Sequence, residues 1–396
     1  MKKKVIILGA GIYQVPLIKK ARENGLYTVV CSIPGRYPGF RFADKVYYVD
    51  TTDKIKMLEI AKNEHISAIL TTGTDSAVRT VGYVCQKLGL TGINALSAKW
   101  ATDKYLMKQR FAAAGVRTAP FYRISNLEQA EKACDQLGFP VIFKCVDKSG
   151  SRGIIKINDV DKIESAFRYC MSCTERSYIL IERFINGSEI GLDGYIDRES
   201  GTRFFIPHNK ILYNNGYTNV PIGHILPFQC STVVWNDLMY QAEKAVDSLE
   251  LDKSFFNMDI LISEGKSYIL EIGARAGGTC IPELLSLYLS CDYYQMMLDN
   301  ALGGKIPLQL PVTVTHACIS KIIVSKKAGT LKSVFLPVKD LHSGEQISLD
   351  YQIGERIPKF KTGTDRIGQI ILSADNESNT FERLLKIEKK VCLTVQ

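Results

Sequence analysis

Two carboxylates occupy matching places on a predicted β-hairpin in the segment FFNMDILISEGKSYILEIGARAGG. Two apolar runs are joined by SEGK, a typical turn sequence, and they carry Asp259 and Glu271. Adjacent strands would project both acids into one space, where their charges repel unless a cation lies between them. Hard oxygen ligands suit magnesium, so the hairpin predicts a divalent-metal site. The alternative is a pair of solvated surface acids, which the flanking apolar residues disfavour.

The residues beside these acids add groups that suit a phosphate. Side chains alternate with a period of two along a strand, so Asn257 shares the face of Asp259. Arg275 follows the second strand and precedes the flexible Gly277 and Gly278. Its guanidinium offers two parallel hydrogen bonds to phosphoryl oxygens. The segment therefore predicts a site for a phosphate group together with its metal ion.

A lysine stands inside an apolar strand pattern at residues 139–153, FPVIFKCVDKSGSRG. A buried ammonium group costs free energy unless an anion meets it, so Lys144 indicates a negatively charged ligand. The following loop offers backbone N–H groups, hydroxyls and flexible glycines to phosphate oxygens. Its candidate residues are Ser149, Gly150, Ser151 and Gly153. The alternative is a lysine that extends to solvent from an edge strand beside an ordinary turn.

A third segment, YILIERFINGSEIGLDGYI, could receive a purine nucleoside. Glu182 and Arg183 end an apolar strand, where backbone groups can meet a purine edge. Phe184 and Ile185 would form walls for the ring, and a carboxylate such as Glu189 would accept from ribose hydroxyls. Taken alone, these residues favour the alternative, a surface strand end with solvated carboxylates.

Loops near the N-terminus, and one histidine farther on, are candidates to meet a substrate. Open α/β sheets bind ligands at the carboxyl ends of their strands, where GAGIYQVP and TTGTDSAV would place Gln14, Thr72, Thr74 and Asp75. Helix capping by Thr74 and Asp75 is the alternative. His224, in NNGYTNVPIGHILP, could face an acceptor site, although a lone histidine is more often structural.

Composition limits the class of protein. At 396 residues, the chain exceeds the roughly 250–300 residues at which a single core stops growing. Its net charge of +9 is spread along the chain, which favours small anions over nucleic acid. The eleven cysteines lack the spacing of a zinc site or a disulfide framework. No apolar run reaches a membrane span of roughly 18 residues, and MKKKVIILGAG lacks a signal-peptide cleavage site, so we expect a cytoplasmic protein without membrane partners.

The order of the apolar runs predicts a multidomain α/β and α+β architecture. The N-terminal region alternates strand and helix patterns, which is typical of a Rossmann-like parallel sheet with helices on both faces. Strand-rich patterns dominate after about residue 190. The expected division is a first domain (1–100), a linking helix (101–117), a small lobe (118–190), a central lobe (191–304) and a strand-rich C-terminal module (305–396).

These pieces, in this order, resemble the ATP-grasp superfamily over roughly residues 1–300. The segment TDKYLMKQRFAAAGVRTAPF, the strand FPVIFK with its S-x-G loop, the hinge IERFINGSEIGLDGYI and the paired acids before GARAGG all look like that family. The similarity is to the branch with phosphoribosylglycinamide synthetases, carbamoyl-phosphate synthetase halves, biotin carboxylases and amino-acid ligases. It implies a pre-ATP-grasp first domain and ATP held between the small and central lobes.

The resemblance also implies how ATP is held. Lys104 and Lys144 match the two lysines that contact ATP phosphates, and residues 149–153 match the mobile flap over them. Residues 182–185 match the segment that meets the adenine. Glu189 matches the ribose ligand.

For the metal site, Asp259 and Glu271 match the magnesium-bridging acids of the family, and Arg275 matches the arginine that steadies the transferring phosphoryl group. One position departs from the pattern, because the family commonly has asparagine where this chain has Gly273. Our hypothesis is that Asn257 compensates as a metal ligand.

The activity that the resemblance implies is ATP-dependent carboxylate–amine ligation with Mg²⁺, or alternatively Mn²⁺. A substrate carboxylate would attack the γ-phosphate to give an acyl phosphate and ADP, and an amine would then displace phosphate. The expected partners are a small carboxylate and a small amine, with the chain as a homodimer. Two alternatives stay open: a bicarbonate-using carboxylase or carbamoyl-phosphate-type enzyme, and a non-catalytic nucleotide-binding protein.

Overall fold

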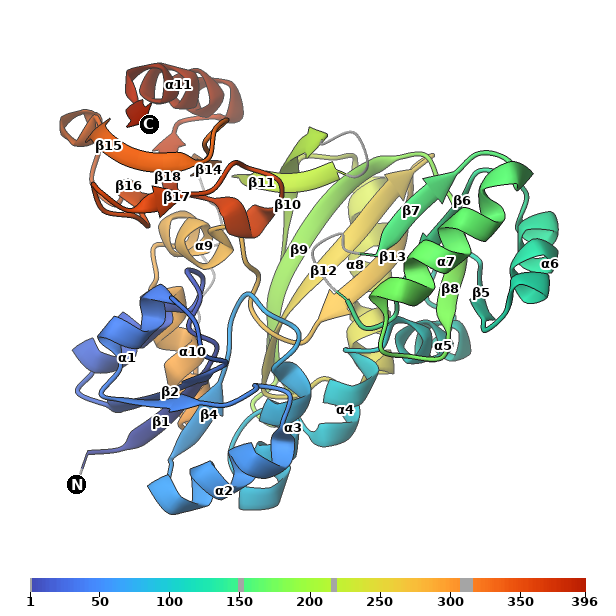
Figure 1. Cartoon of the computed structure of the whole chain (residues 1–396), viewed down its shortest axis with the longest axis horizontal. Coiled ribbons are helices and arrows are strands. Elements are labelled where there is room, and N and C mark those ends of the chain that lie inside the picture. The colour runs from blue at the N-terminus through green and yellow to red at the C-terminus, as the bar shows by residue number, and fades with distance from the viewer. Residues whose placement is uncertain (1, 149–152, 215–218, 307–315) are drawn as a thin grey trace.

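The computed structural model describes residues 2–148, 153–214, 219–306 and 316–396. Their strands form four sheets of four, eight, three and four strands, and the N-terminal sheet and the small lobe lie on opposite sides of the largest sheet (Figure 1). This mixture of parallel and antiparallel sheets confirms the predicted α/β and α+β class. In this part of the chain, no helix combines the length and the apolar character needed to cross a membrane.

The N-terminal sheet is parallel throughout, as its alternating pattern predicts. Its strand order is β3-β2-β1-β4. The strands are β1 (Lys4–Leu8), β2 (Tyr27–Ser32), β3 (Lys45–Tyr48) and β4 (Ala68–Leu70). The accompanying helices are α1 (Val15–Glu23), η1 (Pro38–Phe42), α2 (Lys54–Glu64), α3 (Val78–Leu88) and α4 (Ala95–Trp100).

The linking helix is shorter than the predicted 101–117. Helix α5 (Lys104–Ala114) begins after Asp103, whose carboxylate accepts the N–H groups of Tyr105 and Leu106. It ends at Gly115, which adopts a left-handed conformation with φ of 67°. The two caps set the bounds of the helix.

The small lobe is an antiparallel sheet with strand order β5-β8-β6-β7 and helices packed against it. Lys144 ends the central strand β6 and faces Leu180 of β8 in the register. The elements are β5 (Phe121–Ile124), α6 (Leu127–Leu137), β6 (Val141–Lys144), β7 (Ile154–Ile157), η2 (Val160–Lys162), α7 (Ile163–Cys173) and β8 (Ile179–Arg183).

The largest sheet is antiparallel and runs β13-β12-β9-β10-β11-β14-β18-β16. It includes the predicted hairpin, with Glu264 and Gly265 at positive φ in the turn. Strands from beyond residue 305 continue this sheet through the pairing of β11 with β14. Its elements are β9 (Ser188–Asp197), β10 (Thr202–Asn214), β11 (Asn219–Leu226), α8 (Thr232–Ser248), β12 (Ser254–Ser263), β13 (Lys266–Gly273), β14 (Ala317–Ile323), β16 (Gln346–Leu349) and β18 (Gly368–Ala374).

Most of the remaining elements lie near strands β14, β16 and β18, whereas α10 packs against α1 and β4 of the N-terminal region (Figure 1). Strands β17, β15 and β19 form the three-stranded sheet. The C-terminal region also contains the helix α11. The elements are α9 (Ile281–Leu289), α10 (Tyr293–Ala301), β15 (Gly329–Phe335), η3 (Val338–Asp340), β17 (Arg356–Ile357), η4 (Gly363–Asp365), α11 (Glu377–Lys390) and β19 (Cys392–Val395).

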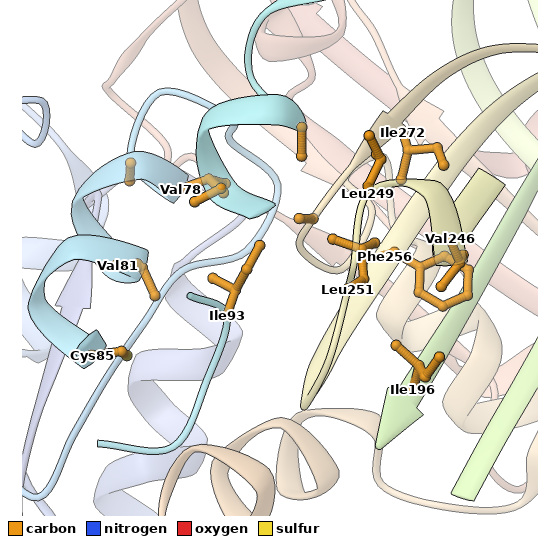
Figure 2. Packing of buried hydrophobic residues seen from close by; sticks show 14 of the residues in the cluster. Val78, Val81, Cys85, Ile93, Ile196, Val246, Leu249, Leu251, Phe256 and Ile272 are labelled. Carbon is orange, nitrogen blue, oxygen red and sulfur yellow. The ribbon is translucent and has the colours of Figure 1, made fainter. Parts of the chain in front are cut away.

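One hydrophobic core joins the N-terminal region to the largest sheet (Figure 2). Val78 of α3 belongs to the same buried cluster as Leu249 and Phe256. Each such side chain contributes about 1.5–3 kcal/mol through burial. The loop after β4 is thereby held against the loop after β13, where the N–H of Gly73 donates to the carbonyl of Ala276 at 3.2 Å.

Candidate active site

The two acids of the hairpin are direct cross-strand partners. Asp259 on β12 faces Glu271 on β13, as alternation predicts. Each carboxylate contacts a different lysine: Lys210 Nζ lies 2.5 Å from Asp259 Oδ1, and Lys104 Nζ lies 2.9 Å from Glu271 Oε1. The acids therefore share one face of the sheet, and each has a neutralising ammonium group.

Lys210 stands between two acids. Its Nζ also lies 2.7 Å from Glu189 Oε1, and its side chain is only 3% exposed. Burial lowers the pKa of Lys210, whereas the carboxylates of Asp259 and Glu189 raise it by a larger amount. The net pKa therefore lies above its usual value. Burial likewise raises the pKa of Asp259, while Lys210 lowers it to a value below normal. We call Glu189, Lys210 and Asp259 the central-sheet cluster; its formal charge is −1.

The small lobe holds a cluster of the opposite composition. Glu182 Oε2 lies 2.9 Å from Lys144 Nζ, and Glu182 Oε1 lies 3.3 Å from Lys108 Nζ. Lys108 also donates to Thr118 Oγ1 at 2.6 Å. Burial lowers the pKa of Lys108 to about 8, although Glu182 opposes this shift. We call Lys108, Glu182 and Lys144 the small-lobe cluster; its formal charge is +1.

Lys104 connects the two lobes. Its Nζ donates to the carbonyl of Lys148 at 2.7 Å as well as to Glu271. Burial lowers the pKa of Lys104, but Glu271 raises it enough to leave the value above normal. The ammonium group is therefore charged and placed where the lobes meet, beside the proposed metal acids.

Most of the predicted phosphate loop lies outside the described residues, namely Ser149, Gly150 and Ser151. Gly153 is described, and its φ of 66° is one that glycine adopts readily. A Cβ at this position would lie 2.2 Å from Cys145 Sγ, so no other residue fits without a shift. The role of the loop stays a prediction.

The predicted adenine segment runs along the end of β8. The guanidinium Nε of Arg183 donates to the carbonyl of Leu137 at 2.9 Å. The Phe184 ring lies 3.6 Å from Lys156 Nζ, and Ile185 is half-buried. Glu182, in contrast, directs its carboxylate into the small-lobe cluster. A purine contact therefore remains a prediction for the backbone of this segment and for Phe184 and Ile185.

Arg275 reaches back to the N-terminal region. Its NH2 lies 2.9 Å from Asp75 Oδ1, and its NH1 lies 3.4 Å from Asn257 Oδ1. Burial lowers the pKa of Arg275, but Asp75 raises it, so the net pKa lies above normal. Asn257 donates its Nδ2 to Asp193 Oδ2 at 2.7 Å, which leaves its amide oxygen on the side of Arg275.

Gly273 is explained by this ion pair. A Cβ on Gly273 would lie 2.8 Å from Asp75 Oδ1 and 3.0 Å from Arg275 Cζ. The space that an asparagine would need is therefore filled by the Asp75–Arg275 pair. Asn257 is the cross-strand partner of Gly273, so its amide lies directly across from the missing side chain.

Of the other substrate candidates in the N-terminal loops, Gln14 and Thr74 bond within those loops, whereas the Thr72 hydroxyl is buried without a hydrogen-bond partner. Gln14 is buried, and it accepts from the N–H of Gly11 while donating to the carbonyl of Thr72. The Thr72 hydroxyl is buried, and the Thr74 hydroxyl lies 3.1 Å from that of Ser76. Gln14 thus braces two loops against each other, and a substrate contact through its amide does not agree with this geometry. The proposed capping is also not observed, because α3 has no side-chain cap.

His224 does not face a cleft as predicted. Its Nδ1 lies 3.1 Å from His208 Nδ1, and His208 Nε2 lies 3.1 Å from Asp193 Oδ2. Burial, with help from His208 and Lys210, lowers the pKa of His224 well below its usual value, so the ring is neutral. Asp193 also accepts the N–H of Gly277 at 3.0 Å. The histidines therefore support, from within the sheet, the loop that carries Arg275.

Sequence reasoning missed Lys108, Lys210, Asp193 and His208. A signal existed for Lys210, which interrupts an apolar strand as Lys144 does. Lys108 lies one helical turn after Lys104 on α5, so both point to the same side. Asp193 and His208 gave no comparable pattern.

A family model described as an ATP-grasp domain matches residues 101–279. This range covers α5, both charged clusters and the loop with Arg275. Residues 101–279 therefore match an ATP-grasp domain. This match confirms the predicted resemblance to the ATP-grasp superfamily. Together with the relatives described next, it also confirms the predicted enzyme class, an ATP-dependent ligase.

Curated relatives and a solved structure agree with this family. The chain is 27% identical over 214 residues to a D-alanine–D-alanine ligase of Geobacter sulfurreducens, covering 53% of this chain and 67% of the relative. It is 23% identical over 367 residues to an L-arginine-specific L-amino acid ligase of Bacillus subtilis, covering 88% and 86%. A phosphoribosylglycinamide synthetase from Anaerococcus prevotii superimposes over all of both chains with a TM-score of 0.84 at 26% identity.

The matched lengths differ between these relatives. Against the D-alanine–D-alanine ligases, this chain spans only 61–67% of the relative's length. The match to the amino-acid ligase of Bacillus subtilis spans most of both chains.

Proposed function

We propose that this ATP-grasp enzyme joins a carboxylate to an amine through an acyl phosphate. The observation that carries the proposal is the presence of two ion clusters of opposite net charge, one in the small lobe and one on the central sheet. Lys104 lies between the lobes, where its ammonium group contacts Glu271 and the carbonyl of Lys148. A nucleotide triphosphate with its metal ion needs both signs of charge at one place: cations for phosphate oxygens and anions for the metal.

The residues present fit ATP and Mg²⁺. Mg²⁺ in nucleotide sites commonly takes one or two carboxylates and completes its shell with phosphates and water. Asp259 and Glu271 supply two such oxygens on one face of the sheet. The described residues contain no group of three or more His, Cys, Asp and Glu side chains arranged for a metal ion. This agrees with a metal that enters together with the nucleotide.

The side chains of the site act by position and charge. When bound, Mg²⁺ would neutralise charge on the phosphates and orient them. Lys104 and Lys144 hold their ammonium groups at the junction of the lobes, where they would bind phosphate oxygens. When ATP binds, each lysine would leave its present carboxylate partner and bind phosphate oxygens, which carry more negative charge. Positioning and charge neutralisation of this kind supply most of the rate enhancement in phosphoryl transfer.

Arg275 would hold the reacting carboxylate or phosphoryl group. Its present partner Asp75 and the acceptor Asn257 orient the guanidinium in the unliganded site. An incoming anion would compete with Asp75 for the same hydrogen-bond donors. The N–H of Gly277 donates to Asp193, which holds the backbone of this loop and so the position of the Arg275 guanidinium.

The experiment is a phosphate-release screen that crosses a panel of carboxylates, including amino acids, with a panel of amines. We expect ADP and phosphate to form only when both substrates are present with MgATP. Hydroxylamine added in place of the amine should give the hydroxamate, which reports the acyl phosphate.

Other outcomes would contradict the proposal in distinct ways. Turnover that depends on bicarbonate, with no added organic carboxylate, would indicate carboxylase or carbamoyl-phosphate chemistry. ATP binding without turnover across the whole panel would indicate a non-catalytic nucleotide-binding protein.

A further inference from the structure

A cavity apart from the charged clusters is lined by residues of α1, of the α9–α10 corner and of strands β16 and β18. Figure 1 shows where these elements lie. Its volume is about 620 Å³, within the range of roughly 300–1,000 Å³ that is typical of small-molecule sites. Its walls are partly apolar, including Val15, Pro16 and Leu349. Neither the lysines of the two clusters nor Asp259 and Glu271 line it.

A buried carboxylate with one unpartnered oxygen lines this cavity. Glu283, in the first turn of α9, lines the cavity and is only 8% exposed. Its Oε2 is buried without a hydrogen-bond partner. A buried acceptor in this state costs roughly 1–3 kcal/mol, and more when it is charged, so it requires an explanation.

The nearest arginine on the cavity wall is committed elsewhere. Arg366 donates from Nε and NH2 to the two oxygens of Asp350, at 2.9 and 3.1 Å. Its NH1 donates to Gln369 Oε1 at 2.8 Å and to Cys280 Sγ at 3.2 Å. Four of its five N–H groups are therefore used by these partners, and Arg366 makes no hydrogen bond to Glu283 Oε2, which remains available to a cationic group from outside.

Two cations without carboxylate partners lie on the outer wall. Lys19 Nζ and the Arg41 guanidinium lie 4.5 and 5.0 Å from the centre of the Phe42 ring. Among the described residues, neither forms an ion pair with an acid. The neighbouring Lys20 differs, because it pairs with acids on either side. The cavity thus combines a buried carboxylate oxygen that has no hydrogen-bond partner with two exposed cations that have no carboxylate partner.

We propose that this cavity binds a free amino acid, with its ammonium group on Glu283 and its carboxylate towards Lys19 and Arg41. The complement of a cavity with an inner anion and outer cations is a zwitterion of the same polarity. The apolar walls would then contact a hydrophobic side chain.

The cavity is separate from the proposed catalytic cleft. Tyr13 stands between them: its ring stacks with Arg366 at 4.9 Å, and its hydroxyl donates to the carbonyl of Gly363 at 2.8 Å. On its other side, the same ring lies 3.8 Å from where a Cβ of Gly278 would be. The site is therefore an addition to the proposed function and does not depend on it. Arg366, which lines the cavity, and the Tyr13 ring that it contacts would connect an occupant to the loop that carries Gly278.

The test is calorimetric titration of the full chain without ATP, using L-leucine as the probe. Two analogues divide its charges: L-leucinamide, at a pH where its amine is protonated, lacks the carboxylate, and 4-methylpentanoate lacks the ammonium group. We expect leucine to bind, leucinamide to bind several-fold more weakly, and 4-methylpentanoate to give no measurable binding. No leucine binding at millimolar concentration, or equal binding of leucine and 4-methylpentanoate, would overturn the proposal.

Variants locate the binding. Glu283→Gln should weaken leucine binding at least tenfold, and the double variant Lys19→Ala with Arg41→Ala should weaken it several-fold, since charge-assisted hydrogen bonds are lost. Lys132→Ala, an exposed lysine on α6, is the matched control and should have no effect. Arg275→Ala should also retain binding. Leucine binding that disappears in Arg275→Ala but survives in Glu283→Gln would place it in the catalytic cleft and refute the second site.

This test is independent of turnover. If the proposed ligase activity fails in the phosphate-release screen, leucine binding to the cavity is still measured. If the binding fails, the phosphate-release screen is unaffected.

Discussion

The small-lobe cluster and the central-sheet cluster are built from the same residue types in opposite proportions. In the small lobe, one acid stands between two lysines; in the central sheet, one lysine stands between two acids. A cluster of ionised side chains with a net charge is stabilised by a counter-ion, so each cluster is suited to a ligand whose charge is opposite to its own net charge. The difference indicates phosphates for the small lobe and a divalent cation for the central sheet.

The two clusters also differ in their access to water. Side chains of Lys108 and Glu182 are 1% and 2% exposed, whereas those of Glu189 and Asp259 are 29% and 42% exposed. Ion pairs that exclude water weigh more on stability, and partly exposed ones exchange partners more easily. We therefore expect the small-lobe cluster to affect mainly folding and the central-sheet cluster mainly catalysis.

The largest effect on this comparison should come from Glu182→Gln. The change leaves Lys108 and Lys144 without a carboxylate in a buried place, and we expect the free energy of unfolding to fall by about 3–5 kcal/mol. Urea denaturation measures it. Glu164→Gln is the control, because Glu164 forms an exposed ion pair with Arg168 and should change stability by less than about 0.5 kcal/mol. Equal losses of unfolding free energy in the two variants would show that the small-lobe cluster contributes no more to stability than an exposed ion pair.

Asp259→Asn tests the other cluster. Lys210 keeps its contact with Glu189, so the free energy of unfolding should change little. Loss of a metal-binding charge should slow the formation of ADP by about 100-fold or more. Steady-state kinetics over a range of Mg²⁺ concentrations measures this. Asp247→Asn, at an exposed ion pair with Arg198, should keep full activity. A large loss of stability with unchanged turnover would reverse the division of roles between the clusters.

The pH dependence of stability distinguishes Lys108 from ordinary lysines. Its pKa of about 8 in the folded protein lies below the usual 10.5, so between these values the folded state binds fewer protons than the unfolded state. The free energy of unfolding should therefore rise with pH across this window, by roughly 2–3 kcal/mol. The difference between wild type and Lys108→Met, measured in urea across this range, isolates the contribution. A difference that does not change with pH would contradict the depressed pKa.

The smallest expected effect belongs to Asn257→Ala, which tests whether this amide supplements the two acids opposite Gly273. We expect the Mg²⁺ concentration for half-maximal activity to rise about tenfold, as is typical when a group supporting a metal site is lost. The exposed Asn63→Ala on α2 serves as the control. Full activity with an unchanged magnesium dependence would dismiss the role of Asn257.

Features within one strand or one hairpin were predictable. Asp259 and Glu271 face each other because a short turn sets the register and side chains alternate. Lys144 stood out because an ammonium group in an apolar strand needs an anion. The parallel N-terminal sheet followed from alternating strand and helix patterns.

The tertiary structure alone decided which charges meet. Lys210 contacts acids 21 and 49 residues away in sequence, and Asp75 contacts Arg275 across 200 residues. The same long-range pairing explains why Gln14 and His224, both suggested by their local sequence, bond inside the protein. The continuation of the central sheet by β14, β18 and β16 was likewise not visible in the sequence.

By itself, the sequence determined the kind of site: lysines for an anion, a cross-strand pair of acids for a metal ion, and the family that combines them. Only the fold decided how the charges are divided between the two lobes and that a cavity apart from them is lined by a carboxylate with one unpartnered oxygen. The physical reason is that alternation and turn geometry act between near neighbours, whereas the balance of a buried charge depends on every strand that packs around it.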